Sequence, residues 1–275
     1  MSKPFLTKHL NTLTLSGLLV IICLLMLTSY LWTQAKDARE MLLEQQFNLS
    51  LVNLSQSIDA RISSMKLIAK TVANDKHIQD WVDTGFAANQ ESILVNKLGF
   101  LVEEYGLTSV SFADKNTNKY WNHEGFLRVL HPEIDTWYFA YLKSAESDLI
   151  SVYHDKNKNR VDVYVNYQQT DGNGLSGIAT SFDGVLDMLK NSLFAKHGDI
   201  YLVDSLGKIQ VHAEADIADI KSLHGMFSKE IVDSLLQPSL SNFIELKQNK
   251  SQLLGASYIP SMNWYVVANV MKVNE

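Results

Sequence analysis

The sequence predicts an α+β fold in which a long N-terminal helix carries two tandem modules of antiparallel sheet with helices. The first observation is the absence of glycine and proline between Gly17 and Gly85, a stretch without the residues that most often break helices. The second is a change near residue 108 to short alternating segments, separated by turns of Asp, Asn and Gly. Because a similar order of hairpin, helix and strands recurs after residue 195, the β-rich part indicates two modules.

The N-terminal helix starts with an apolar run of the length that spans a bilayer. Residues 13–32 contain no charged side chain, and about 20 helical residues at about 1.5 Å each match the hydrocarbon thickness of a membrane. Tyr30 and Trp32 stand at one end of the run, where aromatic rings favour the headgroup layer. The pattern therefore predicts a transmembrane helix over residues 12–33.

The charges before this run predict its orientation. Lys3 and Lys8 precede it without an acidic residue, so the positive-inside bias places residues 1–11 in the cytoplasm and the bulk of the chain outside it. A cleaved signal peptide with a weak small-residue site at residues 33–35 is the alternative. An uncleaved anchor is favoured, because the run is longer than a usual signal core and leads directly into helix.

Apolar residues recur beyond the span at steps of three and four, which places them on one helical face. The pattern predicts a stalk helix over residues 34–84, about 75 Å long at about 1.5 Å per residue. This face packs on the chain's own modules or against a second copy in a homodimer, and both arrangements can hold together. The stripe consists of Phe47, Leu51, Leu54, Ile58, Ile62, Met65, Ile68 and Val72.

The first module is expected over residues 85–195 and the second over residues 196–275. Asp135 is the expected N-cap of a short helix that carries Trp137 and Tyr138. Further helices are predicted at 90–105, 185–194 and 229–236. Strands are predicted at 108–113, 119–121, 150–153, 161–167, 175–181, 200–203, 209–212, 242–246, 253–259 and 264–271.

Composition and motifs argue against several classes of function. A net charge of -6 offers no basic stripe for nucleic-acid phosphates, and Cys23 as the one cysteine excludes a disulfide within the chain. The Asp-x-Asn-x-Asn runs at 114–118 and 155–159 lack the glycine and closing glutamate of an EF-hand calcium loop, so hairpin turns are expected there. No nucleophile elbow, phosphate loop or metal-binding histidine pattern occurs, so no catalytic residue, metal or cofactor is expected.

Aromatic residues gather over residues 128–183 of the first module. Aromatic walls with a few polar groups commonly line small-molecule pockets, although any single one of these rings can equally fill the core. Alternation sends Tyr164 and Asn166 to one face of strand 161–167, and the pattern leaves open which face meets the short helix. The residues concerned are Trp137, Tyr138, Tyr153, Tyr164, Asn166 and Tyr167.

Four segments resemble, in this order, the double Cache family of sensor domains, whose modules are PAS-like. They are HPEIDTWYFAYLKS at 131–144, VYHDKNKNRVDVYVNYQ at 152–168, GLSGIATSFDGVLDML at 174–189 and GDIYLVDSLGKIQVH at 198–212. The resemblance covers about residues 36–271. It implies the periplasmic region of a chemoreceptor, sensor histidine kinase or diguanylate cyclase, held in the bacterial inner membrane.

The resemblance also implies where a ligand binds. In this family the membrane-distal module, here residues 85–195, binds amino acids, amines or short carboxylates. Its pocket uses a Trp-Tyr pair on the helix, aromatic or polar strand residues, and an aspartate after the last strand. The matching residues here are Trp137, Tyr138, Tyr153, Asn166 and Asp183, and Tyr164 is a further candidate ligand-binding residue from the aromatic pattern.

The chain departs from the family at the position that grips an amino-acid carboxylate. Amino-acid-binding members carry an arginine two residues before the Trp-Tyr pair, where this chain has Asp135. A small organic acid is favoured, with Arg128 or Lys143 as its cation, and arginine suits a carboxylate better. An amine, which would pair with Asp135 or Asp183, and an amino acid are the other ligand classes.

A second departure concerns signal output. Family members normally cross the membrane again, whereas the last apolar run here, residues 264–271, is too short to span. The expected function is to bind a small polar metabolite and pass the signal through the stalk to an output domain or a separate kinase, cyclase or chemotaxis component. The alternative is an interaction or scaffold protein whose modules no longer bind a ligand.

Overall fold

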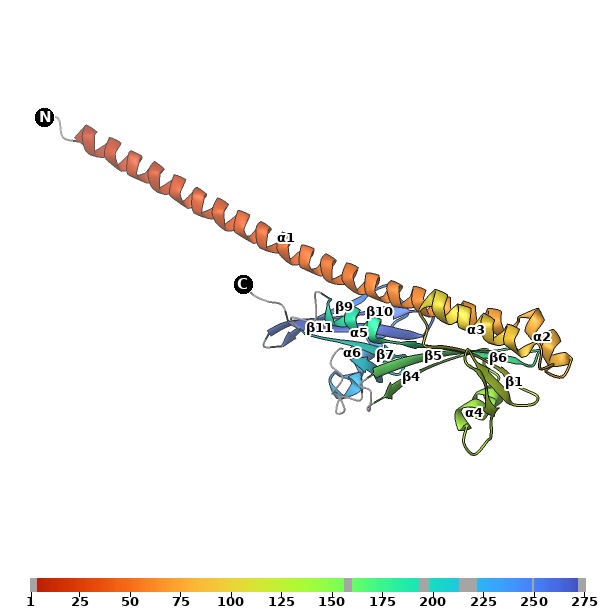
Figure 1. The fold of residues 1–275 in the computed structure, drawn as a ribbon. Helices are drawn as coiled ribbons and strands as arrows, with labels where there is room; N and C mark the ends of the chain where they lie inside the picture. The colour runs from red at the N-terminus through yellow and green to blue at the C-terminus, as the bar shows by residue number, and fades with distance from the viewer. Residues whose placement is uncertain (1–3, 156–159, 193–197, 213–221, 249, 272–275) are drawn as a thin grey trace. The chain divides into compact units, whose positions relative to one another are not determined.

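The computed structural model describes residues 4–155, 160–192, 198–212, 222–248 and 250–271. The chain divides into two compact units, Met1–Leu49 and Ser50–Glu275. Helix α1 runs from Pro4 to Ala73, and the sheets follow it in the chain (Figure 1). The expected module boundary at 195 and most of the turn at 155–159 lie outside the described residues.

The first unit consists of the N-terminal part of α1. Its described side chains between Leu18 and Gln46 are mostly exposed, with large apolar groups such as Leu25 and Trp32 among them. Within the described residues, no helix has both the length and the apolar character that a membrane crossing requires. The transmembrane helix expected at residues 12–33 is therefore not supported.

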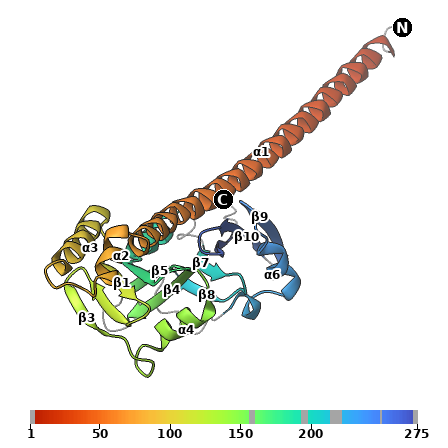
Figure 2. The same cartoon turned by 90° about the vertical axis from the view of Figure 1, so that its right-hand side faces the viewer.

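The rest of α1 belongs to the second unit, where its apolar stripe is buried. Every stripe residue from Leu51 to Val72 is buried, so this face packs on the chain's own sheets (Figure 2). Polar contacts also fix the position of α1 along the two sheets. The Oγ atoms of Ser55 and Ser257 lie 2.6 Å apart, and Arg61 Nη2 donates to Thr180 Oγ1 over 3.1 Å. One helical segment thus holds both sheets, and a homodimer seam stays a prediction.

The predicted single stalk to residue 84 is wrong, because α1 ends at Ala73 and helix α2 begins at Lys76 and ends at Asp83. The Asn74 side chain donates to Lys70 O, and Asp75 accepts from the backbone N–H groups of His77 and Ile78. Such side chains offer the backbone an alternative to helix continuation, so the break needs neither glycine nor proline. Helix α3 runs from Glu91 to Tyr105, which confirms the helix predicted at 90–105, and Gly106 is its C-cap.

The first sheet has six antiparallel strands in the order β3-β2-β1-β6-β5-β4. Strand β3 is absent from the sequence prediction, because it is short and mostly exposed. Trp121 of β2 lies between Trp81 and Phe126, at ring distances of 4.9 and 5.2 Å, which joins α2 to the β2–β3 hairpin. The elements are β1 Ser109–Asp114, β2 Lys119–Asn122, β3 Gly125–Val129, α4 Thr136–Ser144, β4 Asp148–Asp155, β5 Arg160–Gln168, β6 Gly174–Ser181 and α5 Asp183–Lys190.

The second sheet has five antiparallel strands in the order β8-β7-β11-β10-β9. Tyr201, Val203 and Val267 pack with Val232 and Leu235 of α6 in its core. Two tandem modules of antiparallel sheet are thereby confirmed. The elements are β7 Gly198–Asp204, β8 Ile209–His212, the 3-10 helix η1 Leu223–Gly225, α6 Lys229–Leu235, β9 Asn242–Gln248, β10 Lys250–Ile259 and β11 Trp264–Met271.

The buried stripe of α1 predicts a sharp contrast between two positions on the same helix. Ile62 is 0% exposed and Leu67 is 66% exposed. We expect Ile62→Ala to lower the free energy of unfolding by about 2–5 kcal/mol, because it leaves a cavity between α1 and the sheets. Leu67→Ala should change it by less than about 0.5 kcal/mol. Urea denaturation followed by circular dichroism measures both values, and equal losses would contradict the assignment of the buried face.

Candidate functional site

The two faces of the first sheet have different partners. On β1, Ser111 and Ala113 point to one face, and Phe112 and Asp114 point to the other. Ala113 packs in a cluster with Tyr138 of α4, so α4 covers the face that also presents Ser111. On β6, Thr180 meets α1 from the opposite face. The structure thus decides that the short helix lies over the polar face, a choice that the sequence pattern left open.

The predicted Trp-Tyr pair divides between core and surface. Tyr138 is buried, and its hydroxyl donates to Asn118 Oδ1 over 3.4 Å. Burial, with a smaller contribution from the charge of Asp114, raises the pKa of Tyr138, so the ring stays a neutral hydroxyl donor. Trp137 remains 43% exposed and lies edge-on to Tyr138 at 5.8 Å. Of the pair, Trp137 is therefore the ring available to a ligand.

Asp135 is a buried carboxylate whose side chain pairs with Arg128. Its Oδ1 accepts from Arg128 Nη2 at 2.5 Å, and its Oδ2 accepts from His131 N at 2.9 Å. It stands at the N-cap position of α4, as predicted, although its side chain makes no capping hydrogen bond. Burial raises its pKa, but the Arg128 hydrogen bond and the His131 N–H together hold the pKa of Asp135 below its usual value.

A polar row crosses the middle of this sheet face beside α4. Ser111, Gly177 and Asn166 are direct neighbours on β1, β6 and β5. A Cβ atom on Gly177 would lie 2.6 Å from Asn166 Oδ1 and 2.9 Å from Ser111 Oγ, so only glycine leaves room for both groups. Ser111 Oγ donates to Gly177 O over 3.0 Å.

The Asn166 side chain is the least satisfied group of the row. Asn166 is only 6% exposed, no hydrogen bond of the described residues reaches its side-chain amide, and the amide atoms are not fully buried. An amide without a partner in the protein is open to hydrogen bonds from water or from a ligand. Two donors and one acceptor are therefore available to an occupant at this point.

The floor of the site includes residues that the sequence analysis missed. Tyr141 donates through its hydroxyl to Ser147 O at 2.7 Å, and Gln168 Nε2 donates to Tyr141 O at 3.1 Å, which holds the end of α4 on β5. Tyr120 stands beside Ala113 in register, and burial raises its pKa. Alternation along predicted strand 108–113 is the signal that could have found Ser111. No sequence signal marks the Ser111–Gly177–Asn166 alignment, because register sets it.

The remaining predicted residues lie farther from this row. Tyr164 shares the face of Asn166 and is 37% exposed. Tyr153 stands opposite Asp162 on β5, about 13 Å along the strand from Asn166 at about 3.3 Å per residue. Asp183 is exposed in the first turn of α5. The structure thus places Arg128, Asp135, Trp137, Tyr138 and Asn166 around α4, with Tyr153 and Asp183 outside that group.

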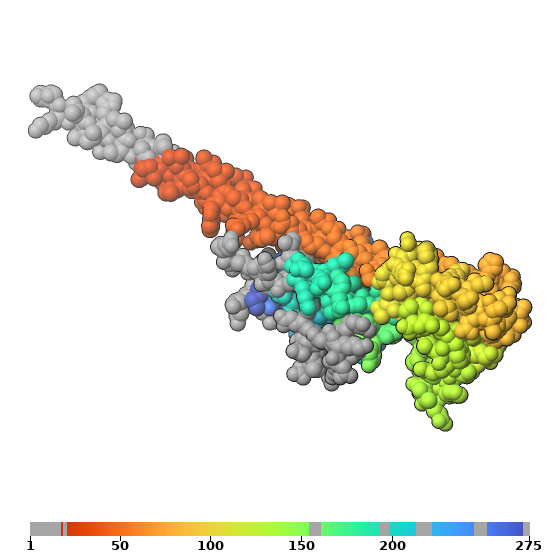
Figure 3. Space-filling view, viewed as in Figure 1, coloured from red at the N-terminus to blue at the C-terminus, as the bar shows by residue number. Residues whose placement is uncertain are grey.

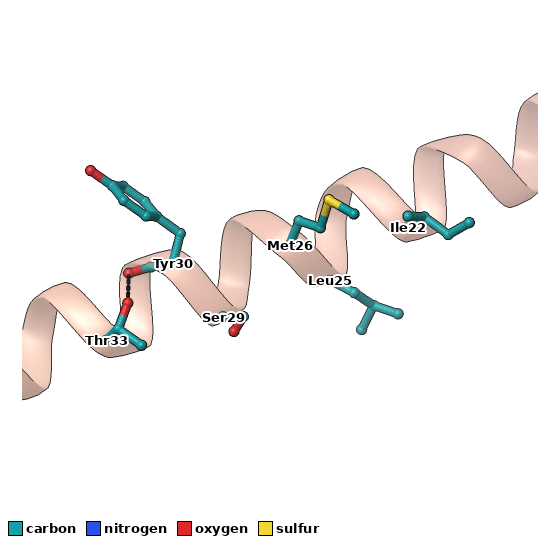
Figure 4. A pocket seen from close by; sticks show the side chains of 6 residues that line it. All are labelled: Ile22, Leu25, Met26, Ser29, Tyr30 and Thr33. Carbon is teal, nitrogen blue, oxygen red and sulfur yellow. Dashed lines mark hydrogen bonds between the residues drawn. The ribbon is translucent and has the colours of Figure 1, made fainter.

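Three cavities of the described structure are lined by residues other than those around α4. A hollow of about 470 Å³ is lined only by residues between Ile22 and Thr33 of α1, and a single helix gives it just one wall (Figure 4). A groove of about 450 Å³ lies between α2 and α3, which are side by side in Figure 3, and Trp81, Ile93 and Lys97 are among its lining residues. A third cavity, of about 190 Å³, lies between α2, β1 and the β5–β6 turn.

Comparison with known proteins relates the chain to receptors that sense chemical signals. No family model matches the sequence. The methyl-accepting chemotaxis protein McpG of Pseudomonas putida is 25% identical over 285 aligned positions, which cover 99% of this chain. The chain spans 42% of the length of that relative.

Solved structures share the fold at low identity. The ligand-binding domain of the Pseudomonas aeruginosa amino-acid chemoreceptor PctC, in complex with GABA, has a TM-score of 0.58 and 13% identity, over 80% of this chain and 96% of that one. The sensory domain of the Campylobacter jejuni chemoreceptor Tlp3, with isoleucine bound, has a TM-score of 0.53 and 13% identity, over 84% and 94%. The ligand-binding domain of the Pseudomonas fluorescens chemoreceptor CtaA, in complex with L-leucine, has a TM-score of 0.54 and 16% identity, over 80% of this chain and 90% of that one.

These comparisons confirm the fold that the resemblance implies. The chain has the Cache-like architecture of ligand-binding sensor domains, with a long N-terminal helix and two antiparallel sheets. The matched proteins are receptors and the sensory domains of receptors.

The buried ion pair predicts a pH-dependent loss of stability in one variant. Because the folded pKa of Asp135 is depressed, its stabilising contribution is present above the unfolded value of about 3.9 and is lost as the pH falls through the folded value. Asp135→Asn should therefore lower the free energy of unfolding by about 1–3 kcal/mol at pH 7. The difference from the parent should shrink below about pH 3. Urea titrations at both pH values measure this, with Asp187→Asn on the exposed face of α5 as the control. An effect independent of pH would show that the carboxylate charge does not matter.

Proposed function

We propose that this chain is the sensory part of a membrane receptor and binds a small polar metabolite between α4 and the first sheet. The observation that carries the proposal is the Asn166 amide, which has no hydrogen-bond partner among the described residues and stands beside Gly177 and Ser111. In a sensor fold, a polar row under a short helix suits a ligand that supplies the missing hydrogen bonds. Trp137, next to Tyr138 on α4, offers an exposed aromatic ring.

A small organic acid is the favoured ligand class. The Arg128 side chain is 55% exposed, and one of its five N–H groups is given to Asp135. The remaining donors can meet a carboxylate in the fork geometry that arginine favours. Asp135 already accepts from Arg128 and from His131 N, so it is poorly placed to serve an amine. GABA, isoleucine and leucine, bound by the similar domains, each carry a carboxylate as well as an amine.

The signal would leave the site through β6 and α1. Gly177 lies on β6, and Thr180 of the same strand accepts from Arg61 of α1. A ligand that shifts β6 by hydrogen bonding next to Gly177 would therefore displace a contact of the long helix directly. Since coupling needs an element with two arrangements, we propose that α1 moves against the sheets and passes the change to a kinase, cyclase or chemotaxis partner.

Titration of the chain with defined acids tests the proposal. Isothermal calorimetry with lactate, pyruvate, succinate, malate and citrate should give a saturable signal for at least one acid. Asn166→Ala should weaken that binding by tenfold or more, because two donors and an acceptor are lost. The matched control is Tyr153→Ala, an exposed position on neighbouring β4, which should retain the parent affinity. Circular dichroism verifies that both variants are folded.

Two results would count against the assignment. Equal affinities in the parent and in Asn166→Ala would place the ligand elsewhere. An absence of heat and of any thermal shift with the acids, and with GABA, leucine and isoleucine, would favour the alternative of a scaffold protein. That alternative has one supporting observation, since Tyr138 and Tyr141 fill much of the space under α4.

A further inference from the structure

The outer face of helix α3 carries two large apolar side chains that the described chain leaves mostly exposed. Ile93 is 62% exposed and Phe100 is 60% exposed. They are seven positions apart, so they share one helical face and lie about 10 Å apart along the axis at about 1.5 Å per residue. Figure 3 shows atoms of α2 and α3 at the surface of the molecule. Large apolar groups that gather on one exposed face mark a contact surface.

The groove between α2 and α3 lies beside the first of these two residues. Its volume is about 450 Å³, and Ile93 stands among its lining residues whereas Phe100 does not. On the α2 side, Ile78 and Trp81 add apolar surface. Along α3 the groove is centred near Ile93, because the lining residues of this helix and its N-cap are Gln90, Ile93, Leu94 and Lys97.

The charged groups around this groove have partners within the chain. Lys97 Nζ donates to Asp75 Oδ2, so the two charges at one side of the groove neutralise each other. Lys76 Nζ pairs with Asp80 Oδ1 at 2.6 Å on α2. Because these opposite charges are paired, the groove suits an uncharged apolar side chain better than an ionic ligand.

Ile93 and Phe100 match each other across a two-fold axis. When two copies of α3 cross antiparallel about the point midway between these residues, Phe100 of each copy faces Ile93 of the other, at the mouth of the groove. The polar pairs that the same axis makes are Lys97 with Asn96, Glu103 with Gln90, and Glu104 with Asn89. No like charges stand opposite each other in these pairs, so the face is complementary to a second copy of itself.

We propose that this face of α3 binds a second copy of the chain, with Phe100 of each copy packed on Ile93 of the other over the groove between α2 and α3. Each copy thereby covers the groove of the other with an aromatic ring. One helix crossing buries less surface than the about 1,200 Å² of a stable interface, so the association is weak and reversible. The inference does not depend on a ligand under α4, and its residues differ from those of a seam along α1.

Chemical cross-linking of the full chain tests this arrangement. Cys23→Ser removes the one native cysteine, and Asn96→Cys in that background places an exposed thiol beside the axis. A short bismaleimide should then join two copies in mild detergent, and Phe100→Ala should lower the yield of covalent dimer by fivefold or more. Ala60→Cys, exposed on α1, is the matched probe for the rival seam along that helix.

Sedimentation velocity over a concentration series measures the same association without a cross-link. Phe100→Ala should weaken self-association by tenfold or more, because it removes the ring that crosses the axis. Ile93→Ala should act in the same direction, since it removes the surface on which that ring packs. The matched control is Met188→Ala on α5, where the side chain is 44% exposed, and it should keep the association constant within about twofold. Circular dichroism verifies that all three variants are folded.

The outcomes separate this interface from its rivals. A covalent dimer through Asn96→Cys that depends on Phe100 supports the proposal. The absence of that dimer, an equal yield after Phe100→Ala, or a dimer trapped by Ala60→Cys alone would each overturn it, and the last result would assign self-association to α1. Because calorimetry with organic acids measures a different property, failure of the ligand site under α4 leaves these results unchanged.

Discussion

The packing of α1 against both sheets is the constraint on which the remaining architecture depends. From Leu51 to Val72 the helix turns one apolar stripe inward, and all of its members are buried. Contacts through Ser55 and Arg61 anchor the second and the first sheet to the same helical segment. Because α1 occupies one face of the first sheet, the other face is left to α4, and polar side chains can gather there without disrupting the main core. The helix therefore decides where a ligand site can exist.

The two faces of the first sheet carry different kinds of polar side chain. Under α4, the charge of the buried Asp135 is neutralised by the partly exposed Arg128, and the groups left over are largely neutral amides and hydroxyls. On the α2 side, carboxylates gather without a basic residue in the lining, and one oxygen of Asp114 has no partner among the described residues. The first arrangement suits a ligand that is recognised by hydrogen bonds.

The β1–β2 turn lies between these two faces. Asp114 holds the turn through Thr117, and Tyr138 of α4 reaches Asn118 in the same turn. The charge of Asp114 also contributes to the raised pKa of Tyr138. The turn is thus a short physical link between α4 and the cavity beside α2, in a fold that the chain shares with receptor sensor domains at only 13–16% identity. Low identity over a common fold is expected when loops and site residues vary on a fixed scaffold.

Elements whose patterns are local could be predicted from the amino-acid sequence alone. The stripe of α1, helix α3, and strands such as β8 and β11 follow from periodicity that each segment carries alone. Tertiary structure decided the rest. The break after Ala73 depends on side-chain capping, the exposed strand β3 on pairing with β2, and the role of Asp135 on Arg128. The alignment of Ser111, Gly177 and Asn166 exists only because three strands distant in sequence pair in one register, and register is set by the whole sheet, not by any segment of it.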